Sequence, residues 1–124
     1  MTDMKYVRLF AGPDGETHFE DVAVEFHSRP STPPELPTAL SELVPADGFR
    51  FMSLPPGWRV EHHAPRRQFL VLLAGCAAIQ TSDGEIRYFH ARDVLLAEDT
   101  TGKGHTSWND GDDALFSVVI PLRD

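Results

Sequence analysis

The stretch of sequence that decides the fold spans residues 57–75 and reads GWRVEHHAPRRQFLVLLAG. Its run from Phe69 to Leu73 is apolar throughout. A strand formed by this run would pack one face against the interior of the protein, and its other apolar face would also have to be covered by protein. Another sheet layer or a second subunit would supply that cover. Because an uncovered apolar face promotes aggregation, we expect a homodimer in which amino-terminal strands add to or cover the neighbouring subunit.

Short β-prone runs bounded by turn residues lie on both sides of this stretch. Between two of them, Asp83-Gly84 tolerates the positive φ of a type I′ turn and predicts a hairpin. The spacing of the runs is typical of an all-β sandwich or barrel. The predicted strands are residues 5–11, 18–26, 48–54, 58–62, 68–74, 76–81, 85–89, 93–98, 105–108 and 114–122.

A proline-rich stretch, residues 29–37, interrupts the strand pattern. Proline fixes φ and removes backbone donors, so this stretch predicts an extended connection. The segment from Thr38 to Leu43 follows it and is the only helix candidate, with Thr38 or Ser41 as the cap and Pro45 ending the helix.

Length and composition limit the classes of function. A chain of 124 residues with 41% hydrophobic and 24% charged residues predicts one globular domain. The net charge of −8 would repel phosphate backbones and anionic lipids, so we expect neither a nucleic-acid partner nor a membrane partner. The N-terminus lacks a signal-peptide pattern and no apolar run is long enough to span a membrane, which predicts a cytoplasmic protein.

Two polar clusters carry a more specific signal. The first begins at Gly57 and contains the adjacent pair His62-His63, followed by Gln68 and, after six more residues, Gly75. The second is residues 100–109, TTGKGHTSWN. The first cluster resembles the first cupin motif, a glycine, a His-x-His pair, a glutamate and a later glycine. The second resembles the second cupin motif, with Gly102, His105 and Asn109 matching and Thr100 in the place of proline.

The resemblance to cupins implies a double-stranded β-helix, the jelly-roll barrel of that family. It covers roughly residues 47–122, so residues 1–46 would supply N-terminal strands and the proline-rich connection of the same single domain. In cupins with an intact site, three histidines and one glutamate bind a metal ion. Here Ala64 takes the place of the second histidine and Gln68 takes the place of the glutamate.

Neighbouring barrel strands present alternate residues inward, so imidazoles and an oxygen donor from two strands can meet around one ion. We expect His62, Gln68 and His105 to form the site, holding a divalent Mn, Fe, Ni or Zn ion in the case that a metal is bound. In an alternative register His63 is the second histidine of the motif and Glu61 is the first ligand. A slip of one residue turns every side chain to the other face, so His63 would face the pocket only if the strand has a bulge.

The cupin fold alone chooses no reaction. A metal-dependent enzyme acting on a small organic molecule is the first hypothesis, and a metal-free ligand-binding or sensor protein is the alternative. We expect Trp58, Arg66, Leu70 and Trp108 to line the ligand pocket. The other interpretations are core packing for the two tryptophans and ion pairing with nearby acids for Arg66.

The alternation of barrel strands also predicts the interior. If Gln68 points inward, Leu70 and Leu72 should line the interior, whereas Phe69 and Val71 should pack outward. His105 should lie on a neighbouring strand close to His62 and Gln68. A separation of more than about 10 Å between the two histidines would exclude a shared site.

Overall fold

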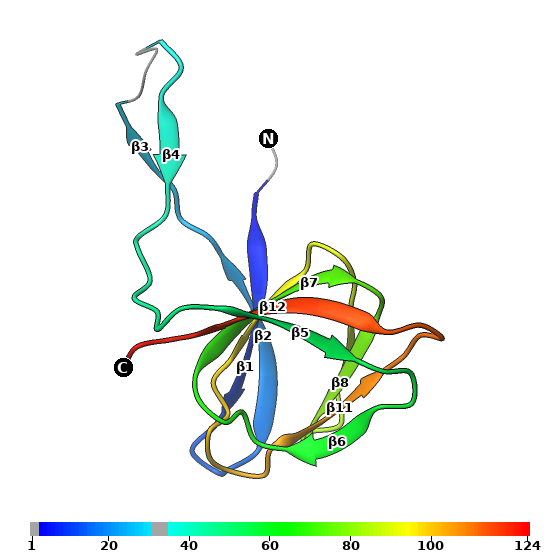
Figure 1. Cartoon of the computed structure of the whole chain (residues 1–124). Coiled ribbons are helices and arrows are strands. Elements are labelled where there is room, and N and C mark those ends of the chain that lie inside the picture. Colours follow the sequence, from blue (N-terminus) through cyan, green and yellow to red (C-terminus); the bar gives the residue numbers. More distant parts are fainter. Residues whose placement is uncertain (1–2, 31–34) are drawn as a thin grey trace.

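The computed structural model describes residues 3–30 and 35–124. These residues form β-strands joined by turns and loops, which confirms the all-β prediction (Figure 1). No described segment forms a helix of the length and apolarity that crossing a bilayer requires. In chain order the strands are β1 (Lys5–Ala11), β2 (Thr17–Ala23), β3 (His27–Arg29), β4 (Thr38–Leu40), β5 (Arg50–Leu54), β6 (Arg59–His62), β7 (Gln68–Ala74), β8 (Ala77–Thr81), β9 (Ile86–Phe89), β10 (Val94–Ala97), β11 (His105–Asn109) and β12 (Leu115–Pro121).

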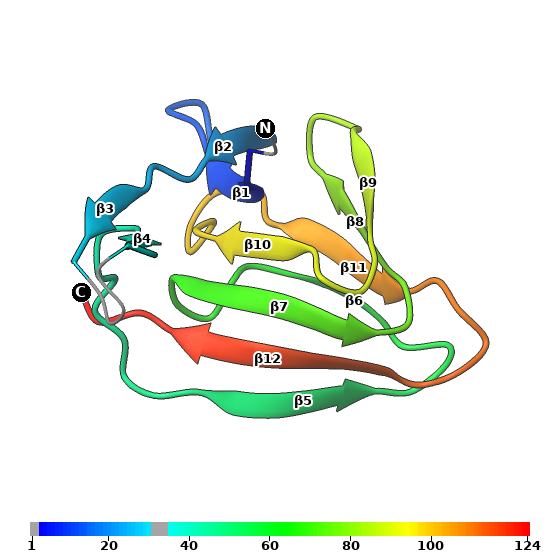
Figure 2. The ribbon, with the colours of Figure 1, turned by 90° about the horizontal axis from the view of Figure 1, so that it is seen from above.

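Two sheets face each other and enclose the core (Figure 2). The first has six strands in the order β2-β1-β10-β7-β12-β5, and the second has four in the order β6-β11-β8-β9. Strand β1 pairs in parallel with β10 and antiparallel with β2. The first two strands of the chain are therefore part of the barrel wall.

Strand β12 illustrates why this sequence forms a two-layered barrel. Leu115, Ser117 and Val119 are buried, whereas the alternate residues Phe116 and Val118 are more exposed and face away from the core. A strand with one buried face needs a second apolar layer opposite it, and the four-stranded sheet provides that layer. The core cluster between the sheets is formed by Leu9, Phe19, Leu72, Ile79, Phe89, Leu95 and Leu115.

The hairpin predicted at Asp83-Gly84 is present. Strands β8 and β9 pair antiparallel on either side of this turn, and Gly84 has a φ of 96°. The carboxylate of Asp83 accepts hydrogen bonds from the Thr81 hydroxyl and from the Glu85 amide, which closes the turn. A local turn signal was therefore sufficient to place two strands.

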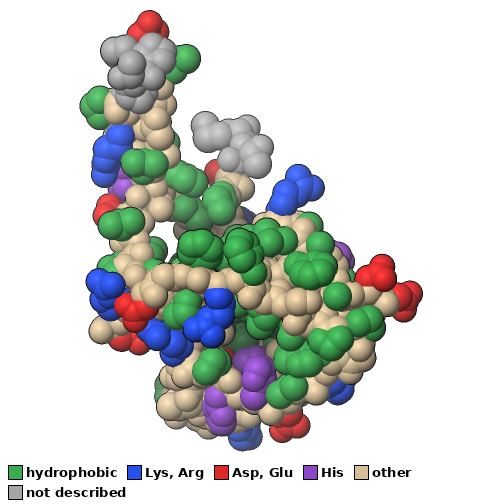
Figure 3. Space-filling model, viewed as in Figure 1, with side chains coloured by type: hydrophobic (Ala, Val, Ile, Leu, Met, Phe, Trp, Pro, Cys, Tyr) green, Lys and Arg blue, Asp and Glu red, His purple; other side chains and the backbone are tan. Residues whose placement is uncertain are grey.

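The helix predicted at Thr38 to Leu43 is wrong, because this segment begins with strand β4, which pairs with β3 in a two-stranded sheet. Pro37 favours an extended backbone before it, and pairing with β3 satisfies the backbone groups that a short helix would leave open. Residues 31–34 of the predicted proline-rich connection lie outside the described residues. The hairpin rises from the barrel, and hydrophobic side chains gather beside its base along the top of the barrel (Figure 3).

Candidate functional site

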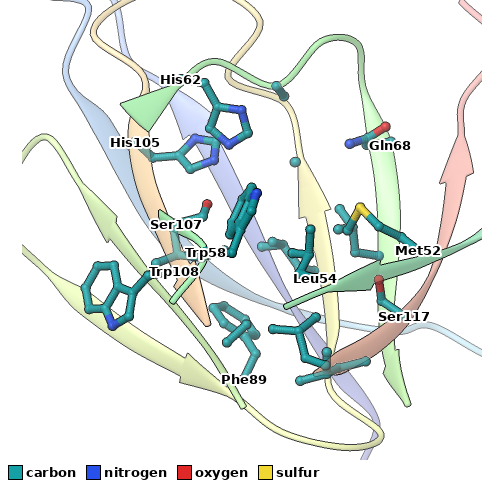
Figure 4. Close-up of a pocket in the computed structure, with 18 of the residues that line it drawn as sticks. Met52, Leu54, Trp58, His62, Gln68, Phe89, His105, Ser107, Trp108 and Ser117 are labelled. Atoms are coloured by element: carbon teal, nitrogen blue, oxygen red, sulfur yellow. The ribbon is translucent and has the colours of Figure 1, made fainter. Parts of the chain in front are cut away.

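A cavity of about 310 Å³ lies between the two sheets. Most of its lining is apolar, with aliphatic side chains from both sheets and the rings of Trp58 and Phe89 (Figure 4). The predicted alternation along β7 is confirmed, since Gln68, Leu70 and Leu72 line the cavity. Phe69 turns outward and its ring contacts Tyr6 on β1, with the ring centroids 5.3 Å apart.

Two imidazoles meet at one end of this cavity. Strands β6 and β11 pair antiparallel with His62 directly opposite His105, and the ring centroids are 4.8 Å apart. Gly104 permits this close pairing, because its φ is 72° and an added Cβ would lie 2.6 Å from the carbonyl oxygen of His62. The two histidines therefore share one face of the sheet, well within the 10 Å limit set from the sequence.

A buried acid lies behind the pair. Asp99 is fully buried, and its Oδ2 accepts a hydrogen bond from Nδ1 of His105 at 2.5 Å. Its backbone carbonyl also accepts the amide of Ala64, which ties the loop before β11 to the end of β6. With Nδ1 committed as a donor to Asp99, Nε2 is the ring nitrogen of His105 that is left for a ligand.

The electrostatic surroundings favour a neutral His62. Burial and the neighbouring His105 imidazole lower the pKa of His62, and the Asp99 carboxyl opposes that shift only in part. The Trp58 ring lies edge-on against His62, with 6.3 Å between centroids. The end of the cavity thus presents one imidazole held by Asp99 and a second one that stays uncharged near neutral pH.

Gln68 lies away from this pair. Its side chain enters the cavity from β7, across the cavity from His62 and His105 (Figure 4). The alternative histidine, His63, follows the end of β6 and lines the cavity at its exposed rim, where its Nε2 is hydrogen-bonded to the carbonyl of Gly102. The structure thus brings together two of the three residues expected to share a site and places the third on the opposite wall.

Of the four other residues expected in the pocket, three line the cavity and one does not. Leu70 and Trp58 line the cavity, and so does Trp108, although its indole packs against the Arg59 guanidinium at 4.6 Å. Arg66 lies outside the lining, which corrects the expectation that it faces the pocket. It donates instead to the Asp47 carboxylate at 2.7 Å and to the Leu122 carbonyl at 2.6 Å.

Two groups of the site escaped the sequence argument. Asp99 comes six residues before His105 in an acidic loop, and no local pattern shows that it is buried. Ser117 is 2% exposed, and its Oγ has no hydrogen-bond partner among the described residues. The sequence does contain a signal for Ser117, because it is a hydroxyl residue at an inward-facing position of a strand that is otherwise apolar.

The donor set does not fit the metal ion that the cupin resemblance implies. Ala64 supplies no ligand, and Gln68 is neutral and lies across the cavity from the two imidazoles. Across residues 3–30 and 35–124, no three His, Cys, Asp or Glu side chains are grouped in a way that could hold a metal. Two imidazoles are fewer than the three protein ligands typical of catalytic metal sites.

Comparison with solved structures finds this fold in other proteins. A cupin 2 conserved barrel domain protein from Salinispora arenicola is 22% identical, with a TM-score of 0.50 over 60% of this chain and 61% of that one. A double-stranded β-helix protein from Klebsiella pneumoniae is 20% identical, with a TM-score of 0.49 over 60% and 64%. A predicted oxalate decarboxylase from Thermotoga maritima is 21% identical, with a TM-score of 0.47 over 99% and 100%.

The match therefore spans less than two thirds of the Salinispora and Klebsiella proteins. No protein-family model and no curated protein matches the sequence. At 22% identity the likeness to the Salinispora barrel shows the fold alone and leaves the activity open. The chain has the double-stranded β-helix fold of a small cupin, as its two motifs predicted.

Proposed function

We propose that the barrel binds a small, largely apolar organic molecule through one hydroxyl group and does so without a resident metal ion. One observation carries this proposal: the paired imidazoles of His62 and His105, with Asp99 behind them, stand at one end of a cavity that is otherwise mainly apolar. An apolar cavity with a few convergent polar groups is the usual form of a small-molecule site.

The chemistry of the two rings specifies the polar group of the ligand. Nε2 of His105 is an acceptor when its ring is neutral, and the neutral ring of His62 carries one N–H donor. A hydroxyl can donate to the first ring and accept from the second. The rings of Trp58 and Phe89 offer flat apolar surfaces to the body of the ligand, which favours an aromatic molecule.

A matched pair of probes tests this recognition. p-Cresol and p-xylene have nearly the same shape, but only p-cresol carries a hydroxyl. Calorimetric titration should show p-cresol binding about tenfold more tightly, the effect of one hydrogen bond of roughly 1.4 kcal/mol. The variant His62→Leu should remove most of this preference, and the control His90→Leu, at an exposed histidine outside the cavity lining, should retain it. Equal binding of both probes, or a preference unchanged in His62→Leu, contradicts the proposal.

Metal content is the second test. Elemental analysis of protein purified without an affinity tag should find transition metal in a small minority of chains, and added Mn²⁺, Fe²⁺, Ni²⁺ or Zn²⁺ should leave the melting temperature unchanged. The variant Ala64→His restores the His-x-His pair of the first motif and should acquire Zn²⁺ binding. Stoichiometric metal in the wild-type protein would favour the metal-dependent alternative.

The Asp99–His105 pair favours a second candidate function, proton transfer on the bound molecule. A carboxyl group bonded to Nδ1 orients an imidazole so that its Nε2 can take a proton from a substrate and return it. Acetophenone in D₂O provides a test, because exchange of its methyl protons is followed directly by NMR. Exchange faster with wild-type protein than with His105→Gln supports catalysis, and equal rates contradict it.

A further inference from the structure

A hydroxyl group is buried on the apolar wall of the cavity. Ser117 on β12 lies directly opposite Met52 on β5 and Leu72 on β7, and Figure 4 shows it beside Met52. Its Oγ is buried and has no hydrogen-bond partner among the described residues. Burying an unpaired hydroxyl opposes folding, and alanine would fill nearly the same space. Packing alone therefore does not account for a serine at this position.

Strand pairing places Ser117 deeper in the barrel than the histidine pair. A short loop joins His62 at the end of β6 to Gln68 at the start of β7, so these two residues lie at the same end of the barrel. Ser117 is opposite Leu72, which lies further along β7. The far end is closed by Asn109, whose side-chain amide donates to two backbone carbonyls. Ser117 is thus a second polar point, on the facing wall and displaced along the barrel from the imidazoles.

The strand pairing beside Ser117 is irregular. Phe116 pairs with Ala74, whereas Ser117 pairs with Leu72, so β7 contains one extra residue, Leu73, at this point. Such β-bulges interrupt regular pairing and are over-represented next to functional sites, where they change the direction of a side chain. The bulge gives the surroundings of Ser117 a second feature that is more typical of a site than of a regular core position.

The charges of the lining limit what can bind beside Ser117. In the part of the chain that the structure describes, no lysine or arginine lines the cavity, whereas the acidic residue Asp93 does. An anionic group facing Ser117 would therefore be buried without a counter-ion, which is costly. The group bound there should be uncharged, and a carbonyl oxygen can accept a hydrogen bond from the Ser117 hydroxyl.

We propose that Ser117 forms a second polar subsite, so that the cavity takes an uncharged molecule with a hydroxyl at one end and a carbonyl at the other. This inference rests on the proposed function, in which His62 and His105 bind the hydroxyl. Facing sheets in proteins lie about 10 Å apart, and one aromatic ring with polar groups at opposite ends can bridge such a gap with a hydrogen bond at each end. A para-hydroxyphenyl ketone has this form.

A second matched pair of probes tests the subsite. 4′-Hydroxyacetophenone and 4-isopropylphenol have nearly the same shape and the same phenol hydroxyl, but only the ketone carries a carbonyl. The ratio of their association constants, measured by calorimetry, should fall about fivefold from wild type to Ser117→Ala, the effect of one neutral hydrogen bond. Comparing this ratio between variants cancels differences in hydrophobicity and phenol acidity. The control Ser53→Ala, at an exposed serine of β5 outside the cavity lining, should keep the wild-type ratio.

The histidine pair and the serine subsite can fail separately in this experiment. His62→Leu should weaken both phenols and keep their ratio, because the carbonyl contact lies elsewhere. A ratio unchanged in Ser117→Ala, or one that falls in His62→Leu instead, overturns the subsite. The proposed function then still stands if p-cresol binds more tightly than p-xylene, since that pair of probes carries no carbonyl. If neither phenol binds, the proposed function and the subsite both fail.

A charged probe tests the restriction to uncharged ligands. 4-Hydroxybenzoate replaces the acetyl group of the ketone by a carboxylate, which is ionised at about pH 7.5. It should bind at least about tenfold more weakly than 4′-hydroxyacetophenone, because the lining offers no lysine or arginine in the described part of the chain. Equal or tighter binding of the carboxylate overturns the assignment of an uncharged carbonyl to this subsite.

Discussion

The two walls of the cavity differ in how their polar groups are arranged. On the wall formed by β6 and β11, His62 and His105 face each other and Asp99 holds one of them by a buried hydrogen bond. On the wall formed by β7 and β12, Gln68 and Ser117 stand apart among aliphatic side chains. Specific binding of a polar group requires donors and acceptors that converge on one point. In the proposed function, the first wall therefore selects the ligand and the second shapes the space around it.

The largest effect should come from the polar wall. Asp99→Ala leaves the buried His105 ring without its partner, and we expect a loss of about 4 kcal/mol in the free energy of unfolding, typical of a broken buried pair. Asp99→Asn keeps an oxygen acceptor for Nδ1 and should lose about half as much. Urea denaturation measures both. A loss below about 1 kcal/mol for Asp99→Ala would mean that the pair does not hold this wall together.

A smaller loss is expected on the apolar wall. Leu72 is buried beside the cavity, so Leu72→Ala should cost about 3 kcal/mol through lost burial and an enlarged cavity. Its neighbour Leu73 is about half exposed on the outer face and serves as the control, with an expected loss below about 1 kcal/mol. Similar losses for both substitutions in thermal or urea unfolding would contradict the assignment of the inner and outer faces of β7.

Ser117 tests whether the apolar wall contains an unsatisfied group. Because its buried Oγ lacks a partner among the described residues, Ser117→Ala removes the cost of burying that hydroxyl. We expect the free energy of unfolding of the ligand-free protein to rise by about 1 kcal/mol. A clear decrease in stability would indicate that the hydroxyl is bonded in solution.

The smallest effect concerns the charge of His62. Its pKa is lowered in the folded protein, so the unfolded chain binds a proton more readily as the pH falls through the ordinary histidine range near 6.5. Stability should therefore decrease as the pH falls from about 7.5 to about 5.5, and less steeply in His62→Gln. Parallel pH profiles for the two proteins would contradict a neutral His62.

Sequence patterns predicted the barrel better than they predicted the site. Alternation along residues 68–74 identified the inner face of β7, and the Asp83-Gly84 turn placed β8 and β9, because both signals are local. The spacing of the cupin motifs placed His62 opposite His105 by resemblance. Which side chains meet in a site depends on which strands become neighbours, and local patterns do not contain this information. Gln68 was expected beside the imidazoles, but its strand β7 belongs to the other sheet.

Long-range partners account for the other differences. Arg66 was expected at the pocket, but Asp47 and the Leu122 carbonyl, both distant in sequence, bind its guanidinium at the surface. Thr38 to Leu43 was expected to be helical, but pairing with β3 makes its first three residues a strand. The burial of Asp99 follows from the hydrogen bond to His105 and from the packing of the loop before β11, which single-sequence patterns do not contain.

A crystal structure of untagged protein soaked with p-cresol, with anomalous data collected at transition-metal edges, tests the central claim most directly. We predict the p-cresol oxygen between the His62 and His105 rings, about 2.6–3.0 Å from a nitrogen of each, with the aromatic ring against Trp58. No anomalous peak should lie between the imidazoles. An ion at about 2.1 Å from both rings, or p-cresol bound with its oxygen toward the β7–β12 wall, would contradict a metal-free site built on the histidine pair.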